Sequence, residues 1–255
     1  MYVERYGDGP IRILGLHGWS GDHRTFAPLR PHLPADASLF APDLPGYGRS
    51  PAPKQWRLNA VTAEIVDLVR NLARPRLAIL GNCSGGLLGL CAVKELQRRG
   101  LAHFVDSIVL IDPLAFWPWY FSIFTSRSIG AYAYACSFQN PVGRWLVNKA
   151  LAGRRREDTD LTEGLEQIPS HLALNSLRLL REIPNVDVFR DIRVPITILY
   201  GKKTFTSVRR SAERYRQVWP QAIVKEIPGS GHIPLREAPA AVARALEENL
   251  RCLRS

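Results

Sequence analysis

A glycine-framed cysteine is the residue in this sequence best placed to do chemistry. Cys83 stands in the segment Gly81-Asn82-Cys83-Ser84-Gly85-Gly86, which follows an apolar run and opens a helical pattern. Glycines two residues before and two residues after Cys83 leave room for a tight bend that exposes the residue at its tip. Centring the frame on Ser84 would put Asn82 where a small residue is required. We therefore expect Cys83 to be a nucleophile that forms thioesters.

A sheet and its covering helices must position this bend, and hydrophobic periodicity predicts both. Strand-like runs alternate with helical patterns, which indicates an α/β fold with a mostly parallel sheet and helices on both faces. Strands are predicted at 2–6 (an edge), 11–16, 38–41, 77–80, 108–111, 196–200 and 222–227, and the last helix at 239–250. The alternation stops after residue 112 and resumes at 192. The prediction is a core formed by 1–112 and 192–255, with a helical lid inserted over 113–191.

Four motifs together resemble those of the α/β-hydrolase fold superfamily. They are His17-Gly18-Trp19, Asp43-Leu44-Pro45-Gly46-Tyr47-Gly48-Arg49-Ser50, the cysteine segment, and Gly229-Ser230-Gly231-His232. The likeness covers nearly the whole chain and is weakest in the insertion. It implies that the backbone N–H groups of Trp19 and Ser84 form an oxyanion hole. It also implies that His232 is the general base that takes the thiol proton and later protonates the leaving group.

The acid that should support His232 departs from the commonest family pattern. Many relatives carry aspartate in a Gly-x-x-Asp turn, where this chain has Gly201-Lys202-Lys203-Thr204. One explanation is that the acid has moved to Asp112, after the predicted strand 108–111, which resembles its placement in haloalkane dehalogenases. The others are a degenerate site or a Cys–His dyad, with Asp112 serving only a strand-ending turn. We favour Asp112 because the carboxyl ends of parallel strands face one crevice.

Cysteine narrows the reaction that such a site could perform. Dehalogenases and epoxide hydrolases need an aspartate ester that water can cleave, whereas an alkylated cysteine would be a dead end. The glycine-framed cysteine is similar to that of polyhydroxyalkanoate synthases, which implies a Cys-His-Asp triad and a covalent acyl-enzyme. We expect hydrolysis or transfer of an apolar acyl group from a thioester or ester, without a cofactor or metal. A carboxylesterase or lactone hydrolase is the second hypothesis. A non-catalytic ligand-binding protein on a degenerate hydrolase fold, suggested by Thr204, is the third.

Aromatic residues gather at the start of the predicted lid. Ten of the chain's 23 lie between Phe116 and Trp145. Because this segment follows a central strand directly, we expect a few of its rings to line an apolar substrate channel and the others to pack lid helices. The expected substrate contacts are Phe116, Trp117, Trp119 and Tyr120.

Composition limits the other classes of function. The 255 residues are 46% hydrophobic and 22% charged, as in a globular protein with a substantial core. The net charge is +11, but the arginines are spread out, and the run Arg154-Arg155-Arg156 is followed at once by acidic residues. With no nucleic-acid module pattern, a solvated basic face is the favoured interpretation, and a docking surface for coenzyme A or an acidic carrier protein is the alternative.

Location and cysteine chemistry are also constrained by the sequence. Neither an export signal nor an apolar run long enough to span a membrane is evident, so we expect a cytoplasmic protein. The four cysteines lack the spacing of metal ligands, and free thiols are expected. We therefore expect the site to bind a small-molecule substrate with an apolar acyl group, and no metal or cofactor.

Overall fold

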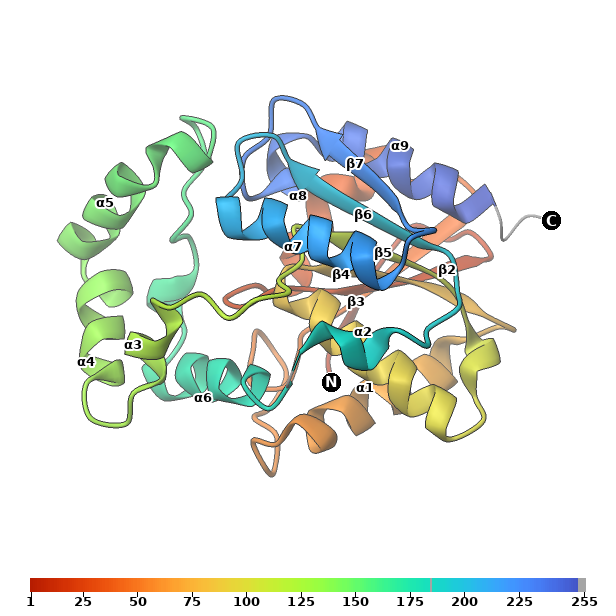
Figure 1. Ribbon diagram of the computed structural model, residues 1–255, viewed down its shortest axis with the longest axis horizontal. Helices are drawn as coiled ribbons and strands as arrows, with labels where there is room; N and C mark the ends of the chain where they lie inside the picture. The colour runs from red at the N-terminus through yellow and green to blue at the C-terminus, as the bar shows by residue number, and fades with distance from the viewer. Residues whose placement is uncertain (184, 252–255) are drawn as a thin grey trace.

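A seven-stranded sheet forms the centre of the protein in this computed structural model, which describes residues 1–183 and 185–251 (Figure 1). The strand order is β1-β3-β2-β4-β5-β6-β7, in which β1 runs antiparallel to β3 and the other neighbours are parallel. The strands are β1 (Val3–Tyr6), β2 (Ile11–Leu16), β3 (Ala37–Pro42), β4 (Leu77–Asn82), β5 (Val105–Ile111), β6 (Ile196–Gly201) and β7 (Ile223–Ile227). The predicted mostly parallel α/β fold is confirmed.

The central strands are apolar along their length because both of their faces are covered. Side chains alternate between the two layers: Ile79 packs with one helical layer, whereas Ala78 and Leu80 pack with the other. The first layer is built from α1 (Leu58–Leu72), α2 (Ser84–Arg98) and α7 (Thr206–Val218). The second contains α9 (Pro239–Leu250) and the 3₁₀ segment η1 (His23–His32). Two buried clusters thus hold the sheet rigid, and the chemistry can be placed at its strand ends.

Between β5 and β6 the chain is helical and irregular, and no strand interrupts its described residues. It contains α3 (Phe121–Thr125), α4 (Gly130–Tyr134), the π-helical turn η3 (Ala135–Gln139), α5 (Pro141–Ala150) and α6 (Ser170–Leu180). Figure 1 shows α3, α4 and α5 to one side of the sheet, with α6 leading back beneath it. We call residues 113–191 the helical insertion. Its role as a lid and its boundaries as a domain stay predictions.

The strand predictions differ from the structure mainly at their ends. Observed β5 begins at Val105, β4 reaches Asn82, and β7 begins at Ile223, while α9 has the predicted bounds. The short helix α8 (Pro234–Glu237), directly after the histidine motif, was not predicted. Cys83, Cys91 and Cys136 are free, and Cys252 lies outside the described residues. None of the described helices combines the length and the apolar character needed to cross a bilayer.

Candidate active site

Cys83 occupies a strained turn between β4 and α2. Its φ of 50° and ψ of −120° lie in a region that L-residues rarely adopt, and its N–H donates to the Ile111 carbonyl at 2.8 Å. The glycine frame has a steric cause. A Cβ on Gly81 would lie 2.4 Å from the Cα of Gly86, and a Cβ on Gly85 would lie 2.2 Å from the Leu16 carbonyl oxygen. The turn can form only because these positions lack side chains.

Asp112 lies directly after β5 and is fully buried. One carboxylate oxygen, Oδ1, accepts the Gly201 N–H at 2.9 Å, and the other, Oδ2, accepts His232 Nδ1 at 2.8 Å. The same Oδ2 accepts a short hydrogen bond from the Thr204 hydroxyl. Thr204 stands where many relatives carry the acid, and here it donates to an acid on the neighbouring strand. Asp112 therefore contacts both the imidazole and the turn from which the usual acid is missing.

The imidazole of His232 lies between Asp112 and Cys83. Burial acts to lower its pKa, but hydrogen bonds and charge attraction from Asp112 and from Cys83 outweigh burial and raise the pKa of His232 to about 10. The ring of Phe205 stands edge-on to the His232 imidazole at 4.7 Å between centroids. The structure thus brings Cys83, His232 and Asp112 together, with an imidazole that favours its protonated form.

A buried carboxylate fixes the loop that carries His232. Glu237 Oε2 accepts the Gly231 N–H and the Ser230 hydroxyl, and its Oε1 accepts the Arg156 N–H at 2.7 Å. The His232 N–H donates to the Arg154 carbonyl at 2.9 Å. Hydrogen bonds to the backbone of Arg154 and Arg156 therefore connect the histidine loop to the helical insertion, and no sequence motif predicts them.

The two expected oxyanion donors are adjacent, but one already has a partner. The Trp19 N–H donates to the Ser84 hydroxyl at 2.7 Å, while the Ser84 N–H, at the start of α2, has no acceptor within the helix. A substrate oxygen would replace the Ser84 hydroxyl as the acceptor for Trp19. The Trp19 indole meanwhile donates to the Ala173 carbonyl at 2.9 Å, so this residue joins the sheet to α6.

The four expected substrate contacts have different environments. The pKa of the Tyr120 phenol is raised, first by burial and second by the charge of Cys83. The second contribution indicates that Tyr120 lies near Cys83. Trp117 is half-buried and packs on a neighbouring ring, whereas Phe116 is exposed and Trp119 is 77% exposed. The structure brings Tyr120 to the site and leaves Trp119 at the surface.

Two hollows differ in size and in distance from these residues. The small one, about 30 Å³, is lined by Trp19, Ser84, Tyr47 and apolar side chains of α6. The Tyr47 hydroxyl there hydrogen-bonds Ser176 of α6 at 2.5 Å. The large one, about 1060 Å³, is an open groove along α1 and α2 and includes none of the residues brought together around His232. The small hollow is the one beside the candidate site, because its lining includes Ser84, the residue after Cys83.

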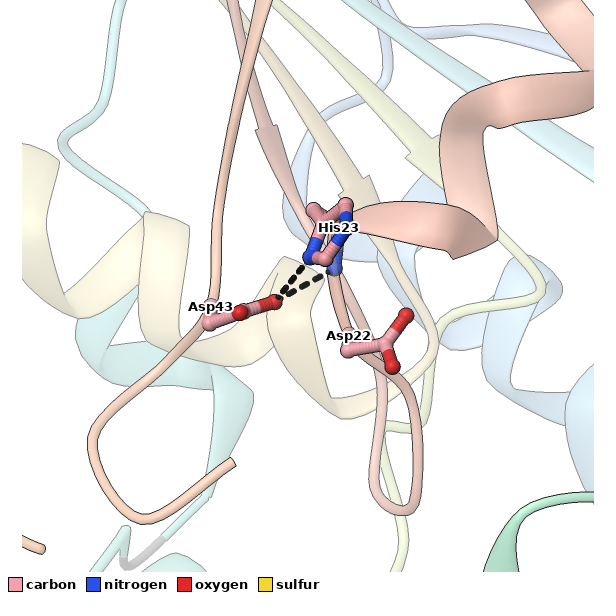
Figure 2. Close-up of side chains that lie close together, drawn as sticks. All are labelled: Asp22, His23 and Asp43. Carbon is pink, nitrogen blue, oxygen red and sulfur yellow. Dashed lines mark hydrogen bonds and ion pairs between the residues drawn. The ribbon is translucent and has the colours of Figure 1, made fainter. Parts of the chain in front are cut away.

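A separate cluster of Asp22, His23 and Asp43 could offer ligand atoms within 4.8 Å of one another (Figure 2). Its groups already have partners. Asp43 Oδ1 accepts both the backbone N–H and Nδ1 of His23 at 2.7 Å, and Asp22 pairs with Arg24. Asp43 Oδ2 also accepts the Arg49 N–H at 2.7 Å. The cluster orders the loops after β2 and β3.

Sequence reasoning missed three contributors to the site. Thr204 was noted only as a missing acid, although a hydroxyl at that position was a signal for a hydrogen bond to a relocated one. Nothing in the sequence links Arg154 or Arg156 to the histidine loop, because their backbone atoms make the contacts. Sequence analysis likewise could not foresee that the Ser84 side chain satisfies the Trp19 N–H.

Comparison with known proteins identifies the family of this chain. The sequence pattern of the alpha/beta hydrolase family matches residues 13–245. The pimeloyl-[acyl-carrier protein] methyl ester esterase of Salmonella typhi is 26% identical, with 96% of each chain covered. A thermophilic esterase from Thermogutta terrifontis has a similar fold (TM-score 0.77, 19% identity, 100% of this chain and 94% of that one). So does MenH from S. aureus (TM-score 0.74, 17% identity, 99% of each). The chain belongs to the alpha/beta hydrolase family.

Proposed function

We propose that this protein is a cysteine-dependent acyl hydrolase or acyltransferase that works through a thioester on Cys83. One observation supports the proposal: His232 Nδ1 donates to buried Asp112 at 2.8 Å, and hydrogen bonding and charge attraction from Cys83 contribute to the raised pKa of the same imidazole. A nucleophile, a base and an orienting acid in this chain of contacts are the parts that covalent acyl transfer requires.

The first half of the reaction forms the acyl-enzyme. His232 holds the proton of Cys83, and the thiolate sulfur attacks the acyl carbon of an ester or thioester. The carbonyl electron pair moves to oxygen, where the N–H groups of Trp19 and Ser84 stabilise the negative charge. When the carbonyl reforms, the bond to the leaving group breaks, and His232 donates its proton to the departing oxygen or sulfur.

The second half returns the free enzyme. Water, or a hydroxyl, thiol or amine acceptor, attacks the thioester carbon while His232 removes its proton. The carbon–sulfur bond breaks, and the acid or transferred acyl product leaves. The Cys83 thiolate is then again beside protonated His232. Asp112 stabilises the imidazolium in both halves and keeps its Nδ1 proton in place.

The substrate we propose is an apolar acyl group on an activated carrier, such as coenzyme A or a carrier protein. The chemical support is that thioesters exchange readily with a thiolate. A carboxylesterase or lactone hydrolase is the second candidate, and it is favoured by a specific observation: relatives and structural neighbours of this chain are named esterases, one of them acting on an acyl-carrier protein methyl ester.

We also propose that the helical insertion acts as a lid. The hollow beside Trp19 and Ser84 has about 30 Å³, room for little more than one methyl group or water. Rings of the insertion close over it, since the Trp19 indole packs on Phe121, Tyr134 and Phe138 with centroids about 6 Å apart. An acyl chain longer than acetyl would therefore require these rings to move.

A chain-length series of acyl-coenzyme A thioesters and p-nitrophenyl esters tests the proposal. We expect an intact-mass increase equal to one acyl group, located by peptide mapping on Cys83 and absent from a Cys83→Ala variant. Release of coenzyme A faster than of p-nitrophenol at matched chain length would favour thioesters, and the reverse would favour the esterase candidate. No adduct and no turnover with either series, together with equal iodoacetamide labelling of Cys83 and Cys136, would leave the non-catalytic ligand-binding protein as the better account.

A further inference from the structure

Helix α5 exposes three of its apolar side chains to solvent, while Val147 packs inward against the cluster around Tyr134 and Phe138. Val142, Trp145 and Leu146 are 64%, 58% and 52% exposed, and the i, i+3, i+4 spacing puts them on one helical face. Lys149, one turn further on, extends this face and stands over the Trp145 ring at 4.8 Å. A helix that packs only against its own protein would be expected to turn such a face inward.

The inner side of α5 explains the inversion. Arg144 forms ion pairs with Asp160 and Glu166, and Asn148 hydrogen-bonds Asp160 at 2.6 Å. The close approach at Gly143, where a Cβ would lie 1.8 Å from the Cys136 carbonyl oxygen, fixes the helix in this orientation. Polar bonds therefore hold α5 in place, and its apolar face is left for something outside the described chain.

Further exposed apolar side chains lie in the part of the insertion that precedes α5. Trp119 is 77% exposed, Tyr132 of α4 is 76% exposed, and Ile129 is 54% exposed. In Figure 1 the helices α3, α4 and α5 form the outer edge of the molecule on the side away from β7. We call these residues, with Val142, Trp145, Leu146 and Lys149, the outer apolar face.

Charge decides which partner fits this face. Acidic residues follow directly after residue 156, but Asp160 and Glu166 pair with Arg144 on the inner side of α5. Arg127 and Lys149 are exposed, and neither forms an ion pair with another described residue. A second copy docking through the same face would bring these like charges together, which disfavours self-association. Tryptophan and tyrosine beside unpaired basic side chains are instead the combination found where proteins rest on anionic bilayers.

We propose that the outer apolar face docks on an anionic lipid surface, with Trp145 and its neighbours at the headgroup boundary. The docking is peripheral, because Val142, Trp145 and Leu146 cover one side of a ten-residue helix. The proposal does not depend on the chemistry at Cys83. It would place the helical insertion, and so the entrance to the site, against a source of apolar acyl substrates.

Vesicle co-sedimentation tests this docking without reference to catalysis. We expect binding to vesicles of equal parts phosphatidylcholine and phosphatidylglycerol, little binding to pure phosphatidylcholine, and loss of binding as salt rises from about 0.1 M to about 1 M. A Val142→Ser/Trp145→Ser/Leu146→Ser variant should bind at least about tenfold more weakly, since binding scales with buried apolar area. Lys149→Gln should cost about fivefold, the usual contribution of one basic residue near such a surface.

Matched controls separate docking from general effects. Ile223→Ser removes an apolar side chain that is 54% exposed on β7, and Lys54→Gln removes an exposed charge outside the face; neither should change binding. Circular dichroism should show the triple variant folded, because α5 has no buried residues. Equal binding of wild type and triple variant would overturn the proposal, as would equal binding to neutral and anionic vesicles. A dimer in sedimentation that the triple variant abolishes, without vesicle binding, would assign the face to self-association instead.

Discussion

The crevice around Asp112 buries polar atoms, whereas the outer face of α5 exposes apolar side chains. In the crevice every oxygen of the Asp112 carboxylate has a donor, and the group is fully buried. On α5 three apolar side chains are at the surface, whereas Arg144 and Asn148 form ion pairs and hydrogen bonds on the inner side. Burial of a charge is tolerable only when it is paired and hydrogen-bonded, so the crevice depends on each of its contacts. The exposed side chains of α5 make no such buried polar contacts.

This difference implies different sensitivities to mutation. Losing one member of a buried polar network leaves its partners without hydrogen bonds, and turnover should fall because the network orients the reacting groups. Losing an exposed apolar side chain changes neither packing nor the site, and its cost appears only when a partner is present. Substitutions in the crevice should therefore have larger effects than substitutions of exposed side chains in the insertion.

Replacing the nucleophile should have the largest effect. Cys83→Ala should lower turnover by about 10⁴-fold or more, and Cys83→Ser should also be severely impaired, because an alcohol does not form the ion pair with imidazole that a thiol does. Cys91→Ala is the matched control: burial raises the pKa of the Cys91 thiol to about 12, so it is protonated and unreactive at neutral pH. Steady-state kinetics on a p-nitrophenyl ester measures all three. A Cys91 variant as inactive as the Cys83 variants would contradict the assignment.

Changing the acid should have the next largest effect. Asp112→Asn keeps the shape but removes the charge that stabilises the His232 imidazolium, and turnover should fall by about 10³-fold. Thr204→Val removes only one of three donors to that carboxylate and should cost about tenfold or less. Both are measured as kcat at saturating substrate. Equal and small effects of the two substitutions would mean that the site works as a Cys–His dyad.

The stability contributed by His232 should depend on pH in a direction that its contacts fix. Its pKa is raised from 6.5 to about 10 in the folded protein, so between these values the folded state binds more protons than the unfolded state. The contribution is therefore complete below pH 6.5 and disappears as pH rises through about 10. The difference in free energy of unfolding between wild type and His232→Gln should shrink by more than about 1 kcal/mol across this window. Urea denaturation at a series of pH values gives this difference, and a gap that stays constant or widens with pH would exclude the protonated imidazole.

The sequence predicted the parts of the site that short-range rules control. The glycines around Cys83 reflect contacts within a few residues, and Asp112 follows from the rule that parallel strands end at one edge. Three contacts join residues that are 92, 81 and 78 positions apart: the Thr204 hydroxyl bond to Asp112, the Glu237 bond to Arg156, and the His232 bond to the Arg154 carbonyl. Such contacts depend on the folded path of the chain, and periodicity carries no information about it.

The insertion shows the same limit more strongly. Periodicity groups Val142, Trp145 and Leu146 on one face of a helix but does not say which way that face points. On the short helix α4, Tyr134 is fully buried while Tyr132 is exposed. The orientation is set by Arg144 and its carboxylate partners, which lie outside the helix itself.

The two tyrosines of α4 give the smallest and most local test of the contrast. The Tyr134 hydroxyl is buried and donates to the Leu165 carbonyl at 2.9 Å, whereas Tyr132 is 76% exposed. Tyr134→Phe leaves that carbonyl unsatisfied and should lower the free energy of unfolding by about 1 kcal/mol. Tyr132→Phe makes the same chemical change two residues away and should shift the free energy of unfolding by less than about 0.5 kcal/mol. Thermal denaturation of both variants measures the pair. Equal losses would mean that the surface of α4 is covered in the folded protein, and the outer apolar face would then not be free to meet a membrane.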